Sequence, residues 1–167
     1  QDLDALWKGL EVGEIQIVAT DHCPFNYAKE KQDGKDDFRK CPNGAPGVEE
    51  RMILLFSEGV MKNKISINKL VEVACTNPAK VYGMYPKKGI IEPGADGDLI
   101  IIDADAKQTL THEMMHGAVD YTSYEGTPLN GKIDLVMQRG NIIAENNEFK
   151  GNRGDGQYIY RKPYFDI

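Results

Sequence analysis

The first apolar segment of the chain, residues 14–19, is short and rich in β-branched side chains. A continuous run of this kind favours a strand that is buried on both faces, as in a parallel sheet. The run ends at a polar cluster in which Asp21, His22 and Cys23 are followed by Pro24. In α/β folds the residues that carry chemistry gather where strands end, so this cluster is the first candidate site.

The next segments alternate between loop and helix. Residues 27–40 are mostly charged and lack apolar periodicity, which predicts a long surface loop of the kind that often binds a ligand. Proline, glycine and asparagine then crowd residues 42–47, which predicts tight turns. The spacing of apolar side chains predicts a helix from Val48, a second helix capped by Ser66 and a short third helix restarted by Asn77 as its N-cap.

The second half of the chain has the pattern of strands. Residues 98–103 hold a continuous apolar run between two acids, and residues 107–111 form a weaker strand candidate. Two further runs, 133–137 and 142–144, flank Arg139-Gly140-Asn141, which predicts a hairpin. One buried strand followed by helices cannot close a parallel sheet, so we expect the chain to be a fragment whose other strands come from elsewhere.

Composition narrows the class of partner. The formal net charge is −6, which argues against nucleic acid or an anionic membrane surface as the main partner. No apolar run approaches the roughly 20 residues that a membrane helix needs, and the first residues do not resemble a secretory signal. The cysteines Cys23, Cys41 and Cys75 form no C-x-x-C pair, so we expect reduced, small apolar side chains and a cytoplasmic protein.

Asp21 is the strongest candidate for catalysis, because an aspartate just past a buried strand is destabilising unless it is paired, hydrogen-bonded or metal-bound. Beside a divalent metal it could serve both as a ligand and as a general base. The alternative role is to cap a turn or a helix. Adjacent side chains on an extended segment point in opposite directions, so we expect His22 to have a structural or supporting role instead of sharing one ion with Asp21 and Cys23.

A second candidate site lies downstream, where residues 112–116 match the H-E-x-x-H pattern of zinc metallopeptidases. On a helix, His112 and His116 would share one face. We disfavour this site because the segment is short and no third histidine follows His116. Asn43, within the turn-rich segment, suits either a plain turn or contact with a polar ligand.

Together these motifs resemble the hydantoinase/dihydropyrimidinase branch of the amidohydrolase superfamily, in order and over nearly the whole chain. Two of them are specific. Residues 20–25, Thr-Asp-His-Cys-Pro-Phe, resemble the motif after the eighth barrel strand. Residues 42–51 resemble the substrate loop that leads into a barrel helix. Residues 76–80, 94–99 and 161–163 are similar to later family segments and are less specific.

The resemblance implies an α/β fold, namely the C-terminal part of a metal-dependent (β/α)₈ TIM barrel followed by strands of a small β-sandwich domain. We expect barrel residues over 1–86, sandwich residues over 87–150 and a tail over 151–167. The resemblance also implies that Asp21 binds one of two divalent metal ions, typically zinc, and shuttles a proton to the leaving ring nitrogen. It further implies that the main chain of Asn43 holds a cyclic imide, and that the reaction opens a hydantoin or dihydropyrimidine ring to an N-carbamoyl amino acid.

The chain departs from the family pattern because it contains no His-x-His pair, and the family's other ligands map upstream of Gln1. We therefore expect this chain alone to bind no metal and to be inactive. The resemblance implies a full-length parent that is a cytoplasmic homo-oligomer, a tetramer, acting on a small cyclic amide, with the tail packed on a neighbouring subunit. The alternatives are a non-catalytic dihydropyrimidinase-related scaffold protein, a dihydroorotase or an allantoinase.

Overall fold

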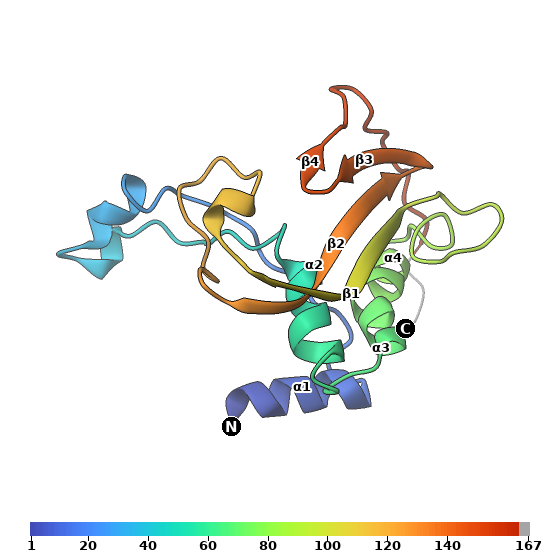
Figure 1. Cartoon of the computed structure of the whole chain (residues 1–167), viewed down its shortest axis with the longest axis horizontal. Helices are drawn as coiled ribbons and strands as arrows, with labels where there is room; N and C mark the ends of the chain where they lie inside the picture. The colour runs from blue at the N-terminus through green and yellow to red at the C-terminus, as the bar shows by residue number, and fades with distance from the viewer. Residues whose placement is uncertain (164–167) are drawn as a thin grey trace.

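A computed structural model describes residues 1–163 of the chain, which form a helical layer packed against one antiparallel sheet (Figure 1). The strands follow the order β1-β2-β3-β4, so each strand pairs with the next one along the chain. The helices are α1 (Asp2–Val12), α2 (Arg51–Leu54), α3 (Ile67–Val71) and α4 (Asn77–Val81). The strands are β1 (Leu99–Thr109), β2 (Pro128–Gln138), β3 (Asn141–Glu145) and β4 (Glu148–Phe149).

The two longer predicted helices are present. The first starts at Arg51 and not at Val48, and α2 continues without a break into a π-helical segment, Leu55–Val60. The cap of the second helix is confirmed, because Ser66 Oγ accepts a hydrogen bond of 3.0 Å from the N–H of Lys69. This bond satisfies one of the N–H groups that every helix start leaves without a partner.

The predicted short third helix is present as α4, but the N-cap role predicted for Asn77 is wrong. Helix α3 runs through a π-helical segment, Glu72–Thr76, directly into α4. Asn77 has helical dihedrals (φ −64°, ψ −45°), and its side-chain amide donates to the carbonyl of Gln16 over 2.9 Å instead of capping. The amide therefore holds residues 14–19 against the start of α4. The chain leaves the helix with Gly83 in the left-handed conformation, at φ 68°.

The strand predicted over residues 14–19 is also wrong, because this segment belongs to no sheet of the described residues. Part of its backbone bonds to the helices instead. The N–H of Val18 donates to Val73 O (3.1 Å), and Arg51 Nη1 donates to Val18 O (3.0 Å). A parallel strand needs neighbouring strands for its ladder, and where none is present its buried polar groups must find other partners.

Helix α1 is not among the predicted elements, although Leu3, Leu6, Trp7 and Leu10 have helical spacing. The spacing could have identified it. Leu10 is buried, whereas Leu3 and Leu6 are exposed on the outer side. Trp7 packs so closely against Gly59 that a Cβ there would lie 2.7 Å from the indole ring. Helix α1 thus packs on the rest of the molecule through Trp7 and Leu10, at its C-terminal half.

The sheet unites the two strand candidates of residues 98–111 in a single long strand, β1. An irregularity divides it, because Asp103 pairs with Lys132 while Lys107 pairs with Asn130, so β1 arches outward between them. The predicted hairpin is confirmed. Its two turn residues, at 139 and 140, both have positive φ (48° and 79°), as a type I′ turn requires.

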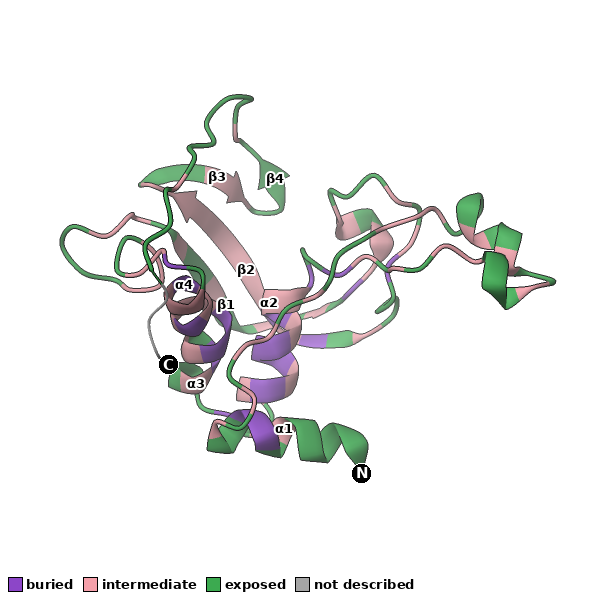
Figure 2. Cartoon of the chain, turned by 180° about the vertical axis from the view of Figure 1, so that it is seen from behind, coloured by how far each residue is buried: buried purple, intermediate pink, exposed green. Residues whose placement is uncertain are grey.

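The core lies between the helices and the sheet, and Figure 2 shows most of the buried positions on the helices. Large apolar side chains such as leucine, valine and isoleucine stabilise a fold by about 1.5–3 kcal/mol each when they are fully buried. Gly131 allows close packing, because a Cβ there would lie 2.7 Å from the ring of Phe56. The most buried apolar residues are Leu110, Val73, Leu129, Ala79, Leu70 and Ile65.

Among the described residues, the α-helices lie within residues 1–86 and the strands within residues 87–150. The division into domains over these ranges stays a prediction. Near the end of the described chain, the N–H of Lys162 donates to Gly83 O over 2.8 Å, and residues 164–167 of the predicted tail lie outside the described residues. Among residues 1–163, no helix combines the length and hydropathy that crossing a bilayer requires.

Candidate functional site

The two specific motifs meet in space. His22 and Ala45 form a parallel β-bridge, and the N–H of Cys23 donates to Ala45 O over 3.3 Å. The approach is close enough to require glycine at position 44, where φ is 119° and a Cβ would lie 2.2 Å from Cys23 O. Residues 20–25 and 42–48 therefore form one unit, which we call the paired segments.

Asp21 lies at the edge of the paired segments, next to the bridge. It is exposed and has a left-handed backbone, with φ 48°. Aspartate tolerates this conformation better than most residues do. No hydrogen bond or ion pair between described residues involves its carboxylate, so both oxygens are free to coordinate an ion or accept a proton. The proposed alternative, a capping role, therefore has no hydrogen bond to support it within residues 1–163.

The imidazole of His22, in residues 20–25, forms hydrogen bonds to the backbone at the end of residues 42–48. Its Nδ1 accepts hydrogen bonds from the N–H groups of Gly47 (3.2 Å) and Val48 (3.3 Å). A ring nitrogen that accepts carries no proton, so the geometry assigns the neutral tautomer with its proton on Nε2. These contacts agree with the structural role that the sequence favours.

Of the cysteines, Cys23 is exposed, whereas burial raises the pKa of the Cys75 thiol.

Asn43 is exposed at the tip of the turn-rich segment. The carbonyls on either side of it, Pro42 O and Gly44 O, each accept a hydrogen bond of 2.6 Å from Lys31 Nζ. The sequence did not single out Lys31, because it lies in a charged run with three other lysines and no local pattern separates them. The structure thus brings Asp21 and Asn43 onto neighbouring segments and places a lysine of the loop against the backbone on both sides of Asn43.

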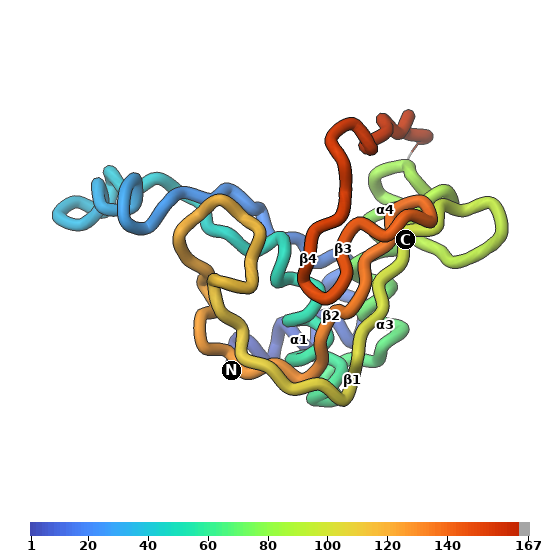
Figure 3. The backbone as a smooth tube through the Cα atoms, turned by 45° about the horizontal axis from the view of Figure 1, so that its top comes forward, coloured from blue at the N-terminus to red at the C-terminus, as the bar shows by residue number. Residues whose placement is uncertain are grey.

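The loop that carries Lys31 projects from the body of the molecule, and its base lies beside the β1–β2 connection (Figures 1 and 3). Within that connection, the carboxylate of Asp120 accepts hydrogen bonds from the N–H groups of Ala28 (2.9 Å) and Tyr27 (2.6 Å). These two donors lower the pKa of Asp120. The rings of Tyr27 and Tyr121 also pack with centroids 5.9 Å apart. The β1–β2 connection therefore holds the base of the loop.

The same connection also holds the two acids that precede α2. Thr122 Oγ1 donates to the buried carboxylate of Glu50 over 2.6 Å. Glu49 binds His116 twice, at its N–H (2.9 Å) and at its Nδ1 (2.6 Å). His116 Nε2 also contacts the carbonyl of Asn147 over 3.1 Å, which links the β3–β4 turn to the same point.

The H-E-x-x-H pattern does not form a metal site. Only His112–Met114 is helical, as a single 3₁₀ turn, and the chain is extended again at Met115. The two imidazoles therefore do not share a helix face. His112 Nε2 contacts Val119 O over 2.6 Å, whereas His116 is bound to Glu49. Over residues 1–163, no three histidine, cysteine, aspartate or glutamate side chains are grouped to hold an ion.

The Glu49–His116 pair predicts a pH dependence of stability. The hydrogen bond to Glu49 raises the pKa of His116 above its ordinary value of 6.5, so folding favours the protonated imidazole. Its stabilising effect is complete below pH 6.5 and is lost as the pH rises through the raised pKa. We expect Glu49→Gln, which keeps an acceptor for the His116 N–H, to lower Tm most at the acid end of a series from about pH 5.5 to 9.

Glu125→Gln is the matched control, because Glu125 accepts from the backbone N–H of His112 over 2.7 Å. Its effect on Tm should not follow the titration of an imidazole. An effect of Glu49→Gln that stays constant across the series would contradict the assignment of the charged pair.

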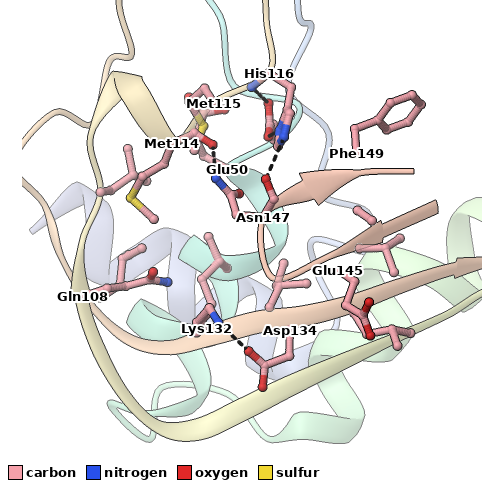
Figure 4. Close-up of a pocket in the computed structure, with 18 of the residues that line it drawn as sticks. Glu50, Gln108, Met114, Met115, His116, Lys132, Asp134, Glu145, Asn147 and Phe149 are labelled. Atoms are coloured by element: carbon pink, nitrogen blue, oxygen red, sulfur yellow. Dashed lines mark hydrogen bonds and ion pairs between the residues drawn. The ribbon is translucent and has the colours of Figure 1, made fainter. Parts of the chain in front are cut away.

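The structure also contains a cavity of about 360 Å³, between the sheet and the β1–β2 connection (Figure 4). Met114, Met115 and Phe149 contribute to its largely apolar lining, and Lys132 pairs with Asp134 at its floor over 2.8 Å. Neither residue of the predicted site lines it. The cavity therefore lies among the sheet, its β1–β2 connection and the start of α2, and no residue of the paired segments lines it.

Comparison with known proteins gives one consistent result. The pattern of the amidohydrolase family matches residues 1–143. A D-phenylhydantoinase of Escherichia coli O1:K1 is 44% identical over 164 residues, which is 98% of this chain and 36% of that relative. The structure matches dihydropyrimidinase from Brevibacillus agri NCHU1002 (TM-score 0.95) and D-hydantoinase from Bacillus sp. AR9 (TM-score 0.94). Each of these is 42% identical, and each match covers 98% of this chain and 36% of the other.

These matches confirm the predicted resemblance and fold class: the chain corresponds to part of a hydantoinase-type TIM-barrel amidohydrolase, with helices and a small antiparallel sheet. It spans about a third of the length of the relatives it matches. Because the family pattern covers most of the described residues, the chain belongs to the amidohydrolase family.

Proposed function

We propose that the paired segments form one wall of the active site of a cyclic amidohydrolase that opens hydantoin or dihydropyrimidine rings. The bridge between His22 and Ala45 is the observation that carries the proposal, because it sets the free carboxylate of Asp21 near the fixed backbone around Asn43. The names of the relatives, D-phenylhydantoinase, D-hydantoinase and dihydropyrimidinase, support the choice of ring.

In this proposal Asp21 is both a metal ligand and the group that moves the proton. When bound, two divalent metal ions, with zinc as our first choice, would polarise the ring carbonyl and lower the pKa of water. One oxygen of Asp21 accepts a proton from the attacking water and delivers it to the ring nitrogen as the C–N bond breaks. Water is thereby added across that bond, and the product is an N-carbamoyl amino acid.

Asn43 has the complementary role of holding the ring. A cyclic imide offers carbonyl oxygens beside a ring N–H, and a main chain offers one donor and one acceptor per residue. Because Asn43 is exposed while its neighbours are fixed, its backbone can meet this edge of the ring without reorganising. Specificity for the ring edge would therefore come from the backbone of the second motif.

The remaining metal ligands have to come from residues other than those of the paired segments, because one carboxylate cannot hold a pair of ions. We propose that this chain acts together with the rest of an amidohydrolase barrel, in a cytoplasmic homo-oligomer, and that it does not turn over substrate alone. The free cysteines agree with a reducing compartment.

A chimera tests the proposal. The part of E. coli D-phenylhydantoinase that lies outside the match is joined to this chain, and hydrolysis of hydantoin and dihydrouracil is measured together with metal content. We expect the chimera to hold about two metal ions and to open at least one ring. The chain alone should do neither. A folded, metal-loaded chimera that hydrolyses neither ring would contradict the proposal, and so would turnover by the chain alone.

A further inference from the structure

We propose that Lys31 is a positioning residue, which fixes and polarises the backbone on both sides of Asn43 so that this backbone can hold the substrate ring. The inference rests on the proposed function. It starts from the two hydrogen bonds of 2.6 Å that Lys31 Nζ donates to Pro42 O and Gly44 O. One ammonium group thus binds the carbonyl before Asn43 and the carbonyl after it.

Lys31 is built into the fold of the loop. It is half-buried and lies in a 3₁₀ helix, Glu30–Gly34. Its N–H donates to Asn26 O over 3.1 Å, and its ammonium lies 5.7 Å from the centre of the Phe25 ring. Within residues 1–163, no acidic side chain forms an ion pair with it, so its charge is directed at the two carbonyls. Hydrogen bonds from a charged donor are roughly twice as strong as neutral ones.

The two hydrogen bonds from Lys31 affect how strongly the N–H of Asn43 can donate, and they also hold the backbone of Asn43 in position. Pro42 O belongs to the same peptide unit as the N–H of Asn43. A charged donor at that oxygen draws electron density through the amide and makes its N–H a better hydrogen-bond donor. On the other side, Gly44 O is held just before Ala45, whose own carbonyl accepts from Cys23. The backbone of Asn43 is thereby fixed relative to the segment that carries Asp21.

The loop can exert this effect because it is itself anchored. Asp120 accepts from the N–H groups of Tyr27 and Ala28 at the base of the loop. The loop returns tightly as well, since a Cβ on Gly34 would lie 2.4 Å from Cys41 Cβ. The contacts of Asp120 at the base of the loop and of Gly34 with Cys41 on its return therefore hold Lys31 against the paired segments.

The test uses the chimera described above and substitutes Lys31→Met, which keeps the aliphatic stem and removes the ammonium. A main-chain contact that is equal in the ground state and the transition state contributes uniform binding, so its loss raises KM and leaves kcat unchanged. We expect KM to rise about tenfold or more, with kcat within about threefold and metal content unchanged. Lys31→Arg, which keeps the charge, should recover part of the loss. Lys35→Met, an exposed lysine in the same loop, is the matched control and should leave KM unchanged.

The outcomes separate this inference from the proposed function. An active chimera whose KM does not respond to Lys31→Met overturns the role of Lys31 and leaves the proposed function intact. A fall in kcat that parallels a loss of metal or of folded protein, in both Lys31→Met and Lys31→Arg, shows a structural role and also overturns the inference. An unsubstituted chimera that folds, binds metal and opens no ring overturns both proposals.

Discussion

Asp21→Asn in the chimera is expected to lower kcat for ring opening by about 10³-fold or more, because the group that moves the proton and binds the metal is lost. The substitution removes the charged group without disturbing the local backbone. Asp21 has a left-handed backbone at φ 48°, and asparagine adopts this conformation as readily as aspartate does. We therefore expect the unfolding temperature of the metal-free chimera to stay unchanged, whereas elemental analysis of the loaded chimera should show a loss of bound metal.

Asp36→Asn is the matched control for this substitution, since Asp36 is also exposed but lies in the projecting loop. It should leave both kcat and metal content unchanged. If Asp21→Asn retained most of the activity, the carboxylate would lie outside the reacting groups. The resemblance would then have identified the family without identifying the proton carrier.

Gly44→Ala is expected to lower the free energy of unfolding by about 2–3 kcal/mol, by forcing apart the paired segments. A Cβ at this position would lie 2.2 Å from Cys23 O and 2.8 Å from Cys23 Cβ, and backbone cannot yield as a flexible side chain does. Separating the segments breaks the bridge between His22 and Ala45 as well. In the chimera we expect a rise in KM in addition, because the backbone of Asn43 moves with its neighbour.

Two effects contribute at Gly44, the positive φ of 119° and the clash, and a second glycine separates them. Gly94 has φ 99°, but a Cβ there would meet nothing within 4 Å. Gly94→Ala should therefore show only the smaller cost of the backbone conformation, with KM unchanged. Chemical denaturation of both variants measures the difference. Equal losses of stability would mean that the clash is relieved and that the close approach is not required.

The sequence predicted those features that depend on a few neighbouring residues. The hydroxyl of Ser66 and the turn at Arg139-Gly140 need only local backbone geometry, and both are present as predicted. The apolar run at 99–102 lies in a strand for a similar reason, because β-branched side chains favour extended backbone wherever a partner strand is available. The two motifs that carry the resemblance are also local, which is why they identified the family.

Other predictions failed because their outcome depends on distant parts of the molecule. The apolar segment 14–19 has the composition of a buried strand, but a strand is completed only by neighbours, and in this chain the helices take part of its backbone hydrogen bonds. The H-E-x-x-H pattern presumes a helix, whereas the contact of His116 with Glu49 and Asn147 holds this segment outside any helix. The N-cap role predicted for Asn77 failed for the same reason, since its side-chain amide donates to the carbonyl of Gln16.

Local patterns in the chain therefore identified the family, predicted the hairpin and the helix cap, and marked Asp21 and Asn43 as site candidates. Packing across the fold set what these patterns did not contain. It placed the two residues on paired segments, joined the segments through Nδ1 of His22, and brought Lys31, alone among the lysines of its loop, to the carbonyls beside Asn43. A motif specifies which groups are present, whereas a hydrogen bond between distant segments requires a distance and a direction that only packing sets.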